Sequence, residues 1–378
     1  MLVTLGGERI ALLGRARVYV CGITPYDTTH IGHAATAVWS DVAIRFLRSL
    51  GQHVEVTRNV TDVDDALMEA SVRSGTPWRS LASQQTFRFA DDMARLGIST
   101  PTNEPLAHNF VDEVIALAAA LVELGHAYVS DGSVYFAHLG VAERAGLTYD
   151  QALSIAAERG GQVDDPAKRD PLDAALWVRS APDEPTWDSP WGPGRPGWHA
   201  ECSAMALATL GPGLDLHCGG VDLAFPHHAF EAAQAEAASG VTPFARAWLR
   251  AGMVIHGGQK MAKSTGNLVF VDDVLREATP AALRLLICQR RWWATWEFDE
   301  ADLPAAQVQV VALRHAAASG GDETGRRAVI AALADDLDIP TALSIAEEAG
   351  GSAAELLIDV LGLRHLEPVA RSMLIPTP

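Results

Sequence analysis

The sequence predicts an α/β fold in which a Rossmann-like parallel sheet carries an inserted subdomain and precedes a short C-terminal α-helical domain. Residues 17–22 have the pattern of a buried strand ending in Gly22, residues 30–50 that of a helix, and residues 54–57 that of a second strand. This strand–helix–strand order is typical of a parallel sheet. The Ala/Leu-rich residues 301–378 predict the helical domain. In open sheets of this kind, ligands bind at the carboxyl ends of the strands.

The elements on either side of this strand–helix–strand segment are predicted from local patterns. Residues 1–20 predict a strand, a glycine turn and another strand. Residues 59–65 are expected to form the polar loop at the end of the second sheet strand. Residues 66–125 are expected to be mostly helical, with a break at 101–105, where proline interrupts the pattern.

Residues 126–200 are rich in Pro and Gly, and we expect them to be irregular and to form an insertion between two halves of the nucleotide fold. The following elements are, in order, sheet at 214–217, an Ala-rich helix at 226–239, a Lys/Ser/Gly loop at 260–267, a helix at about 279–291 and helices over 301–378. We find no internal repeat.

Composition narrows the class of protein. The 378 residues, 48% hydrophobic and 20% charged, are ordinary for a globular chain, and no long uncharged apolar run predicts a membrane span. The N-terminus lacks a secretory pattern, so a cytoplasmic location is expected. The formal charge of −18 repels polyphosphates and gives no basic footprint for nucleic acid, although a local basic patch can coexist with it. The four cysteines are too few and too scattered for a disulfide framework.

A histidine pair opens the first long helix. His30 and His33 are three residues apart, so both imidazoles can face the same ligand, and Gly32 leaves room for a nucleotide to approach. A helix N-terminus adds oriented N–H groups and the positive end of the helix dipole. Alone, this pattern is more often structural than catalytic.

A lysine loop lies about 230 residues further on. Lys260 and Lys263 could neutralise the β- and γ-phosphates of a nucleotide as charge develops, with Met261 and Ser264 beside them. Neighbouring glycines would let the loop close. A lone loop of this kind is usually only solvated, but the two segments in this order predict a site that activates a carboxylate with ATP.

A second set of residues suits a thiol-selective metal. Cys21 ends the first sheet strand, Cys202 lies far away in the chain, and His227 and Glu231 share a helix face because they are four apart. Two thiolates, an imidazole and a carboxylate make a tetrahedral zinc set, although each cysteine or histidine alone could equally be a buried core residue. Zinc binds a thiolate much better than a hydroxyl, so it would separate cysteine from serine.

Seven segments together resemble the class I cysteinyl-tRNA synthetase family. They are residues 21–27, 30–33, 59–65, 195–199, 219–223, 225–228 and 260–264. The resemblance covers about residues 17–300. It implies a class I synthetase sheet in residues 1–255 with an insertion at about 103–200, lysine-loop and linking helices in 256–300, and a shortened helical domain in 301–378 without an anticodon-binding domain.

The resemblance also implies roles for single residues. The implied zinc ligands are Cys21, Cys202, His227 and Glu231, with Cys218, which stands where a glycine is usual, left open as an alternative. The implied cysteine pocket is lined by Thr24, Thr61 and Trp198, with Asp222 holding the substrate ammonium. The implied ATP-binding and catalytic residues are His30, Gly32, His33, Lys260, Met261, Lys263 and Ser264.

Two branches of the family share these motifs: the tRNA synthetases and the mycothiol cysteine ligases, which join cysteine to glucosaminyl-inositol. Residues 22–25, 158–161, 292–298 and 334–338 resemble the ligases, and the tail has five Arg, no Lys and eleven acidic residues, which offers few phosphate contacts. Residues 187–192 and 203–205 resemble the synthetases, as does Glu231, which the ligases usually lack.

The predicted function is therefore ATP-dependent activation of L-cysteine as cysteinyl-adenylate, with Zn²⁺ and Mg²⁺, and transfer to the amine of glucosaminyl-inositol. Transfer to tRNA or another carrier is the nearest alternative, so tRNA is not expected but stays open. A non-catalytic paralogue that binds cysteine or nucleotide is more distant. We expect a monomer or a homodimer.

Overall fold

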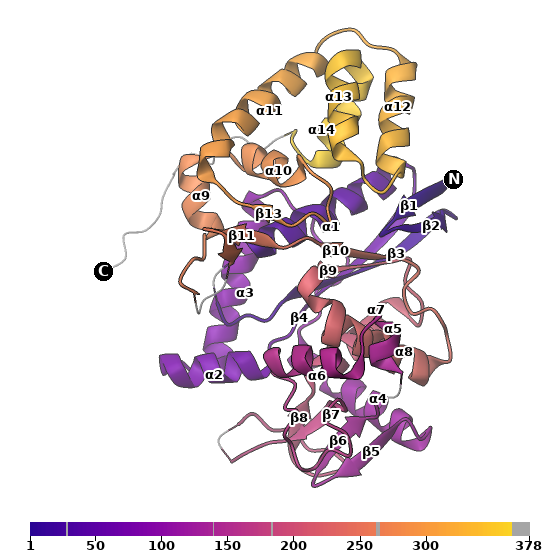
Figure 1. The fold of residues 1–378 in the computed structure, drawn as a ribbon, viewed down its shortest axis with the longest axis vertical. Helices are drawn as coiled ribbons and strands as arrows, with labels where there is room; N and C mark the ends of the chain where they lie inside the picture. Colours follow the sequence, from indigo (N-terminus) through magenta and orange to yellow (C-terminus); the bar gives the residue numbers. More distant parts are fainter. Residues whose placement is uncertain (28, 139, 183, 262–264, 365–378) are drawn as a thin grey trace. The chain divides into compact units, whose positions relative to one another are not determined.

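The computed structural model describes residues 1–27, 29–138, 140–182, 184–261 and 265–364 (Figure 1). Contacts divide the chain into two compact units. The first contains Met1–Thr28, Gln52–Phe87 and Pro101–Ala251, and the second contains Thr29–Gly51, Arg88–Thr100 and Gly252–Pro378. None of the helices in the described ranges combines the length and the apolar character that a membrane crossing requires.

The first unit is built on a four-stranded parallel sheet. Its strands are β3 (Arg15–Ile23), β4 (His53–Val60), β9 (Leu216–Gly220) and β10 (Trp248–Ala251), in the order β10-β9-β3-β4. The predicted parallel sheet is confirmed. Its four strands end at the same edge because they are parallel, so the residues that follow β3, β4 and β9 are neighbours.

Helices carry side chains towards this sheet. In the first unit, α7 (Trp198–Leu210) packs against β3, β4 and α8 (Ala229–Ser239). Both helices are rich in alanine, which lets them approach their neighbours closely. The helix α2 (Asp65–Ser74) begins just after β4, and the hairpin of β1 (Leu2–Leu5) and β2 (Glu8–Ala11) precedes β3, as expected from the glycine turn.

The inserted segment is more regular than we expected. The prediction of irregular chain over 126–200 was wrong, because four short strands form an antiparallel sheet, β5 (Ala127–Ser130), β6 (Ser133–Phe136), β7 (Ala174–Arg179) and β8 (Gly194–Pro196). The turn between β5 and β6 is Asp131-Gly132, both with positive φ, which is a strong hairpin signal that the sequence already contained. The same part of the chain also contains three helices, α4 (Val111–Glu123), α5 (Val141–Arg144) and α6 (Tyr149–Glu158).

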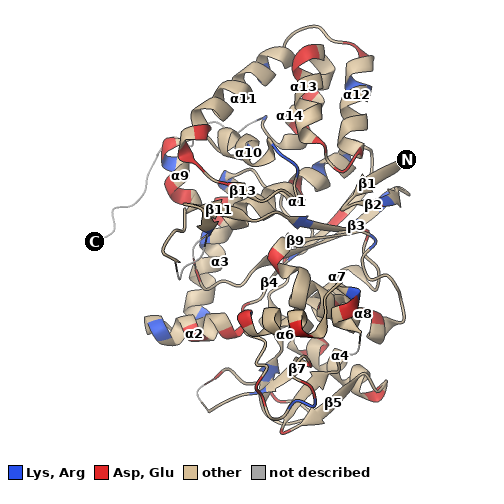
Figure 2. Ribbon diagram, viewed as in Figure 1, with Lys and Arg blue, Asp and Glu red and all other residues tan. Residues whose placement is uncertain are grey.

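The second unit contains α1 (Ile31–Ser49) and the helices of the C-terminal third. These are α9 (Val271–Glu277), α10 (Pro280–Cys288), α11 (Leu303–Ala317), α12 (Glu323–Ala334), α13 (Ile339–Ala349) and α14 (Gly351–Leu361). A small sheet of β11 (Val254–His256), β12 (Gln259–Lys260) and β13 (Trp296–Glu297) joins them. The predicted C-terminal helices are confirmed, and Figure 2 shows acidic and basic segments interspersed along them. The long helix α3 (Trp78–Arg95) has residues in both units.

Candidate active site

The predicted metal ligands lie at the carboxyl edge of the parallel sheet. Cys21 is near the end of β3, and Cys202 is in the second turn of α7. His227 belongs to the irregular turn 224–228 that leads into α8, and Glu231 lies one turn further on. All four side chains are almost fully buried.

Three of these residues have the geometry of a metal group. One ligand atom each from Cys21, Cys202 and His227 lies within 4.8 Å of the others, and Nε2 of His227 is 3.2 Å from Sγ of Cys202. Tetrahedral zinc with bond lengths of 2.0–2.3 Å would place such atoms about 3.3–3.8 Å apart. The spacing therefore fits a metal ion after small side-chain adjustments.

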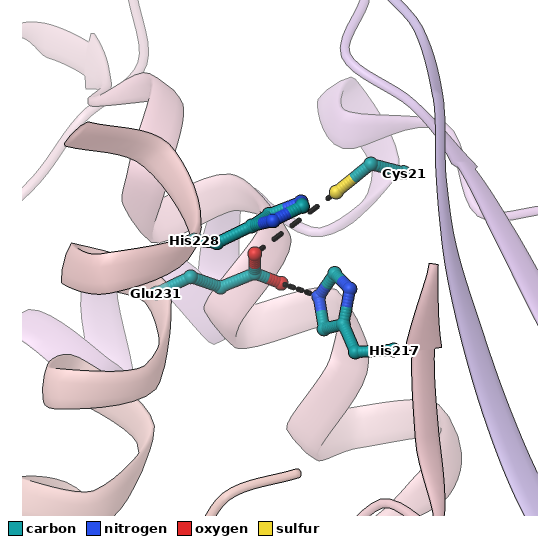
Figure 3. A group of neighbouring side chains, drawn as sticks. All are labelled: Cys21, His217, His228 and Glu231. Atoms are coloured by element: carbon teal, nitrogen blue, oxygen red, sulfur yellow. Dashed lines mark hydrogen bonds and ion pairs between the residues drawn. The ribbon is translucent and has the colours of Figure 1, made fainter. Parts of the chain in front are cut away.

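A second, overlapping group includes two residues that the sequence reasoning did not select. Figure 3 shows Cys21, His217, His228 and Glu231 pointing toward one another. The Glu231 carboxylate lies 4.0 Å from Sγ of Cys21 and 2.9 Å from Nε2 of His217. Its Oε2 is also 3.9 Å from Nε2 of His227, so Glu231 lies close to ligand atoms of both groups.

Strand register explains why His217 joins this site and Cys218 does not. The parallel pairing places Tyr19 beside His217 and Val20 beside Cys218. Side chains alternate between the faces of a sheet, so His217 shares the face of Tyr19 and Cys21, while Cys218 points to the other face. Among the described residues, neither candidate metal group contains Cys218.

The electrostatics of the site favour a bound cation. Burial raises the pKa of Cys21 and of Cys202, because a thiolate loses its hydration there. Burial also lowers the pKa of His227 well below its ordinary value, which keeps the imidazole neutral and able to ligate a metal. A divalent cation would supply the missing positive charge for two thiolates, so the donor set fits zinc.

Neighbouring side chains fix the orientation of these ligands. Nδ1 of His227 is 2.9 Å from Nδ1 of His199, so a metal on Nε2 would leave the Nδ1 proton of His227 to be donated to His199. The ring of Trp198 stacks on His227 with centroids 4.2 Å apart. On the other side, Nδ2 of Asn59 donates to Sγ of Cys202 at 2.8 Å. Asn59 was expected in a loop but belongs to β4, which extends to Val60.

The predicted cysteine pocket starts beside Cys21. The hydroxyls of Thr24 and Thr61 are 2.8 Å apart, and they join the segments that follow β3 and β4. Asp222 lies in the short helical turn Val221–Leu223 just after β9. These residues and Trp198 all belong to the first unit, and their roles in binding cysteine stay predictions.

The predicted phosphate motif opens α1 in the second unit. His30 is the N-cap residue of α1, and its Nδ1 accepts a hydrogen bond from the Gly32 amide at 3.1 Å. Its ring stacks on His33 with centroids 3.9 Å apart. A Cβ on residue 32 would lie 2.8 Å from Cε1 of His30, so glycine is needed for this ring position. The two imidazoles thus form one surface at the helix N-terminus.

The lysine loop belongs to the same unit. Lys260 ends β12 and is exposed, whereas Met261 is buried. Lys263 and Ser264 lie outside the described residues. After the loop, the Ile31 amide donates to Val269 O at 3.0 Å and the Val271 amide donates to Thr29 O at 3.0 Å. The chain that follows the lysine loop is therefore bonded to the residues that open α1.

The fold and these two motif sets define a class I synthetase type of catalytic domain. A model of the family described as "tRNA synthetases class I (C) catalytic domain" matches residues 10–308. The chain belongs to this family.

Several relatives of this chain carry a more particular name. The L-cysteine:1D-myo-inositol 2-amino-2-deoxy-alpha-D-glucopyranoside ligase of Thermobispora bispora is 43% identical over 338 residues, which are 88% of this chain and 84% of the relative. The ligase of the same name from Streptomyces griseus is 45% identical over 340 residues, 87% of this chain and 82% of the relative. The predicted sequence relationship to the cysteine ligase branch is confirmed.

Solved structures share the fold at low sequence identity. Mycobacterium tuberculosis methionyl-tRNA synthetase with methionyl-adenylate has a TM-score of 0.61 at 16% identity and covers 93% of this chain and 82% of its own. An Agrobacterium radiobacter leucyl-tRNA synthetase in a ternary complex has a TM-score of 0.62 at 10% identity, covering 92% and 83%. These likenesses confirm the class I synthetase fold.

Proposed function

We propose that this chain activates L-cysteine with ATP and transfers it to the amino group of glucosaminyl-inositol, forming an amide and releasing pyrophosphate and AMP. The observation that carries the proposal is the buried group of Cys21, Cys202 and His227 at the carboxyl edge of the sheet. A thiol-selective metal site in a class I synthetase domain points to cysteine as the activated amino acid. The names of the relatives support the acceptor.

The first unit selects the substrate. Cys21, Cys202 and His227, with Glu231 beside them, would hold a zinc ion, which would bind the thiolate of cysteine more strongly than the hydroxyl of serine. Thr24 and Thr61 line the space next to Cys21, and the Asp222 carboxylate pairs with the substrate ammonium. The Trp198 ring, stacked on His227, forms an apolar wall for the cysteine side chain.

The second unit serves the nucleotide. His30 and His33, at the N-terminus of α1, bind the ATP phosphates and stabilise negative charge as the cysteine carboxylate attacks the α-phosphate. Lys260 and Lys263 neutralise the departing pyrophosphate, and Mg²⁺ accompanies the ATP. No enzyme nucleophile takes part, because positioning and charge stabilisation suffice.

Two assays test the proposal. Cysteine-dependent exchange of pyrophosphate into ATP reports activation, and we expect exchange with cysteine but not with serine. AMP release is then measured with glucosaminyl-inositol and with tRNA as separate acceptors. We expect the aminosugar alone to stimulate release.

The outcomes separate the alternatives. Stimulation by tRNA alone would make the chain a tRNA-charging enzyme, and the proximity of Glu231 to both metal groups is the feature that favours that candidate. Absence of exchange would instead indicate a non-catalytic member of the family.

A further inference from the structure

The Asp64 carboxylate accepts a hydrogen bond through one of its two oxygens. Asp64 is the N-cap residue of α2, and its Oδ1 accepts a hydrogen bond from the Ala66 amide at 2.7 Å. In the described ranges, no donor is within hydrogen-bond distance of Oδ2. The cap thus orients the carboxyl group and leaves one oxygen able to accept a proton.

This carboxylate lies in the loop that forms the predicted cysteine pocket. Asp64 follows Thr61 by three residues, and the Thr61 hydroxyl is 2.8 Å from that of Thr24. Burial raises the pKa of the Tyr26 phenol, and the negative charges of Asp64 and Asp222 raise it further. Asp222 is the residue that is predicted to bind the substrate ammonium. Asp64 therefore lies at the carboxyl edge of the sheet, near the pocket residues of β3, β4 and β9.

The two other acidic residues of this loop, Asp62 and Asp65, already have hydrogen-bond or ion-pair partners. Asp62 accepts from the His108 amide at 3.0 Å and pairs with the His108 ring. Asp65 forms an ion pair of 2.5 Å with Arg195. Within this loop, Asp64 is the acid whose Oδ2 remains available for a substrate proton.

Its own burial, together with nearby carboxylates, makes Asp64 a good proton acceptor near neutral pH. Burial raises its pKa to about 7, with the charges of Asp65 and Glu69 adding to the effect and the Ala66 amide and Arg195 opposing it. Burial raises the pKa of the Glu201 carboxyl, and the charge of Asp64 raises it further; among the described residues, neither Glu201 oxygen has a hydrogen-bond partner. The charged and titratable groups that face Asp64 are thus Asp65 and Glu69 of α2, Arg195 of β8, Glu201 of α7 and Tyr26 of the loop after β3.

We propose that Asp64 is the general base that takes the proton from the acceptor amine as the amine attacks the activated carboxyl of cysteine. The inference rests on the proposed function, because only an amine acceptor must lose a proton on nitrogen. The nitrogen lone pair forms the new C–N bond, and the bond from the carbonyl carbon to the phosphate oxygen breaks. Its electron pair leaves on AMP, and one N–H proton passes to Oδ2 of Asp64 and then to water.

The substitution Asp64→Asn tests this role and leaves the fold intact. Asparagine is as good an N-cap as aspartate, so α2 is kept while the base is lost. Cysteinyl-adenylate is formed first, and then amide formation with glucosaminyl-inositol is measured in a single turnover. We expect the variant to lower that rate roughly 10²- to 10⁴-fold at pH 7, which is the range of general-base catalysis. In the wild type the pH profile contains an ionisation near pH 7 from the Asp64 carboxyl, in addition to that of the acceptor amine, and the Asp64 ionisation is absent from the variant.

Hydroxylamine provides the control reaction, because it is largely neutral at pH 7 and attacks an acyl-adenylate without a base. We expect Asp64→Asn to form cysteine hydroxamate at nearly the wild-type rate. Glu69→Gln removes the same charge from an exposed position on the same helix, and we expect it to keep both reactions.

Each result has one interpretation. Amide formation at the wild-type rate in Asp64→Asn, or equal losses with both nucleophiles, overturns the proposal for Asp64. If the wild type forms hydroxamate but no amide with glucosaminyl-inositol, the acceptor is wrong, and the proposed function fails together with the proposal for Asp64. A selective loss of the amide supports both.

Discussion

Asp41 and Arg284 form a buried ion pair that holds α1, the helix that begins at the histidine motif. Their side chains are 1% and 0% exposed, and Nη2 of Arg284 is 2.7 Å from Oδ2 of Asp41. Arg284 also donates to Leu361 O at 2.7 Å and to Leu96 O at 3.0 Å, so one guanidinium joins three segments of the second unit to α1.

The substitution Asp41→Asn keeps the shape of the side chain but leaves the Arg284 charge unpaired. Removing one partner of a buried pair costs roughly 3–5 kcal/mol, since the remaining charge stays in a low-dielectric environment. We therefore expect the free energy of unfolding to fall by about that amount at pH 7. Urea titrations followed by tryptophan fluorescence and circular dichroism measure the change.

The stability difference between wild type and Asp41→Asn should also depend on pH in a predictable direction. The charges of Arg284 and Arg45 outweigh burial and lower the pKa of Asp41 below its usual value. A lowered carboxyl pKa stabilises the folded state above the ordinary aspartate pKa of about 4, and this stability is lost as the pH falls below it. The difference between wild type and variant should therefore be full at pH 7 and shrink below about pH 4.

Asp273→Asn is the matched control. Asp273 pairs with Arg276 at 2.9 Å, but both side chains are more than half exposed, so its loss should cost less than about 1 kcal/mol. A comparably small cost for Asp41→Asn, or a cost that does not change with pH, would refute the reasoning.

Three further predictions concern the first unit. Chelation, or Cys202→Ala, should weaken the use of cysteine in pyrophosphate exchange much more than it weakens ATP binding; equal losses would indicate a purely structural metal. Gly22→Ala would place a Cβ 2.0 Å from the Asn59 carbonyl oxygen, so β3 must shift against β4, and we expect reduced zinc content and a raised KM for cysteine. A normal metal content in that variant would contradict the close approach. Asp64→Asn should gain stability relative to wild type as the pH rises from about 4 to 8, because the raised pKa of about 7 makes folding less favourable across that window. Urea midpoints at pH 5 and pH 8 measure this difference, and equal differences at both pH values would contradict it.

Local sequence patterns predicted most of the regular elements. The helix starting at His30 and the strand through Cys21 were found near their predicted bounds, because burial periodicity and capping are local properties. The antiparallel sheet of the insertion was missed. Its strands have only three to six residues, too few for a clear alternation, and the Asp131-Gly132 turn was not recognised as a hairpin signal.

The residues of the candidate site were likewise predictable from the sequence only in part. Contiguous motifs identified Cys21, His30 and Lys260, because each motif carries its chemistry within a few residues. Nothing local marks His217 as a neighbour of Glu231, since that contact depends on which strand pairs with β3 and in which register.

The sequence alone therefore determined the kinds of group present: thiols, imidazoles and lysines in the order of a cysteine-activating enzyme. The tertiary structure decided which of them meet. It brought Cys21 and Cys202 together from 181 positions apart and packed α1 with the C-terminal helices. It also buried Asp64 among other acids, and a pKa near 7 arises only from such burial. The physical reason is that side-chain chemistry is encoded residue by residue, whereas distance and dielectric environment are set by long-range packing.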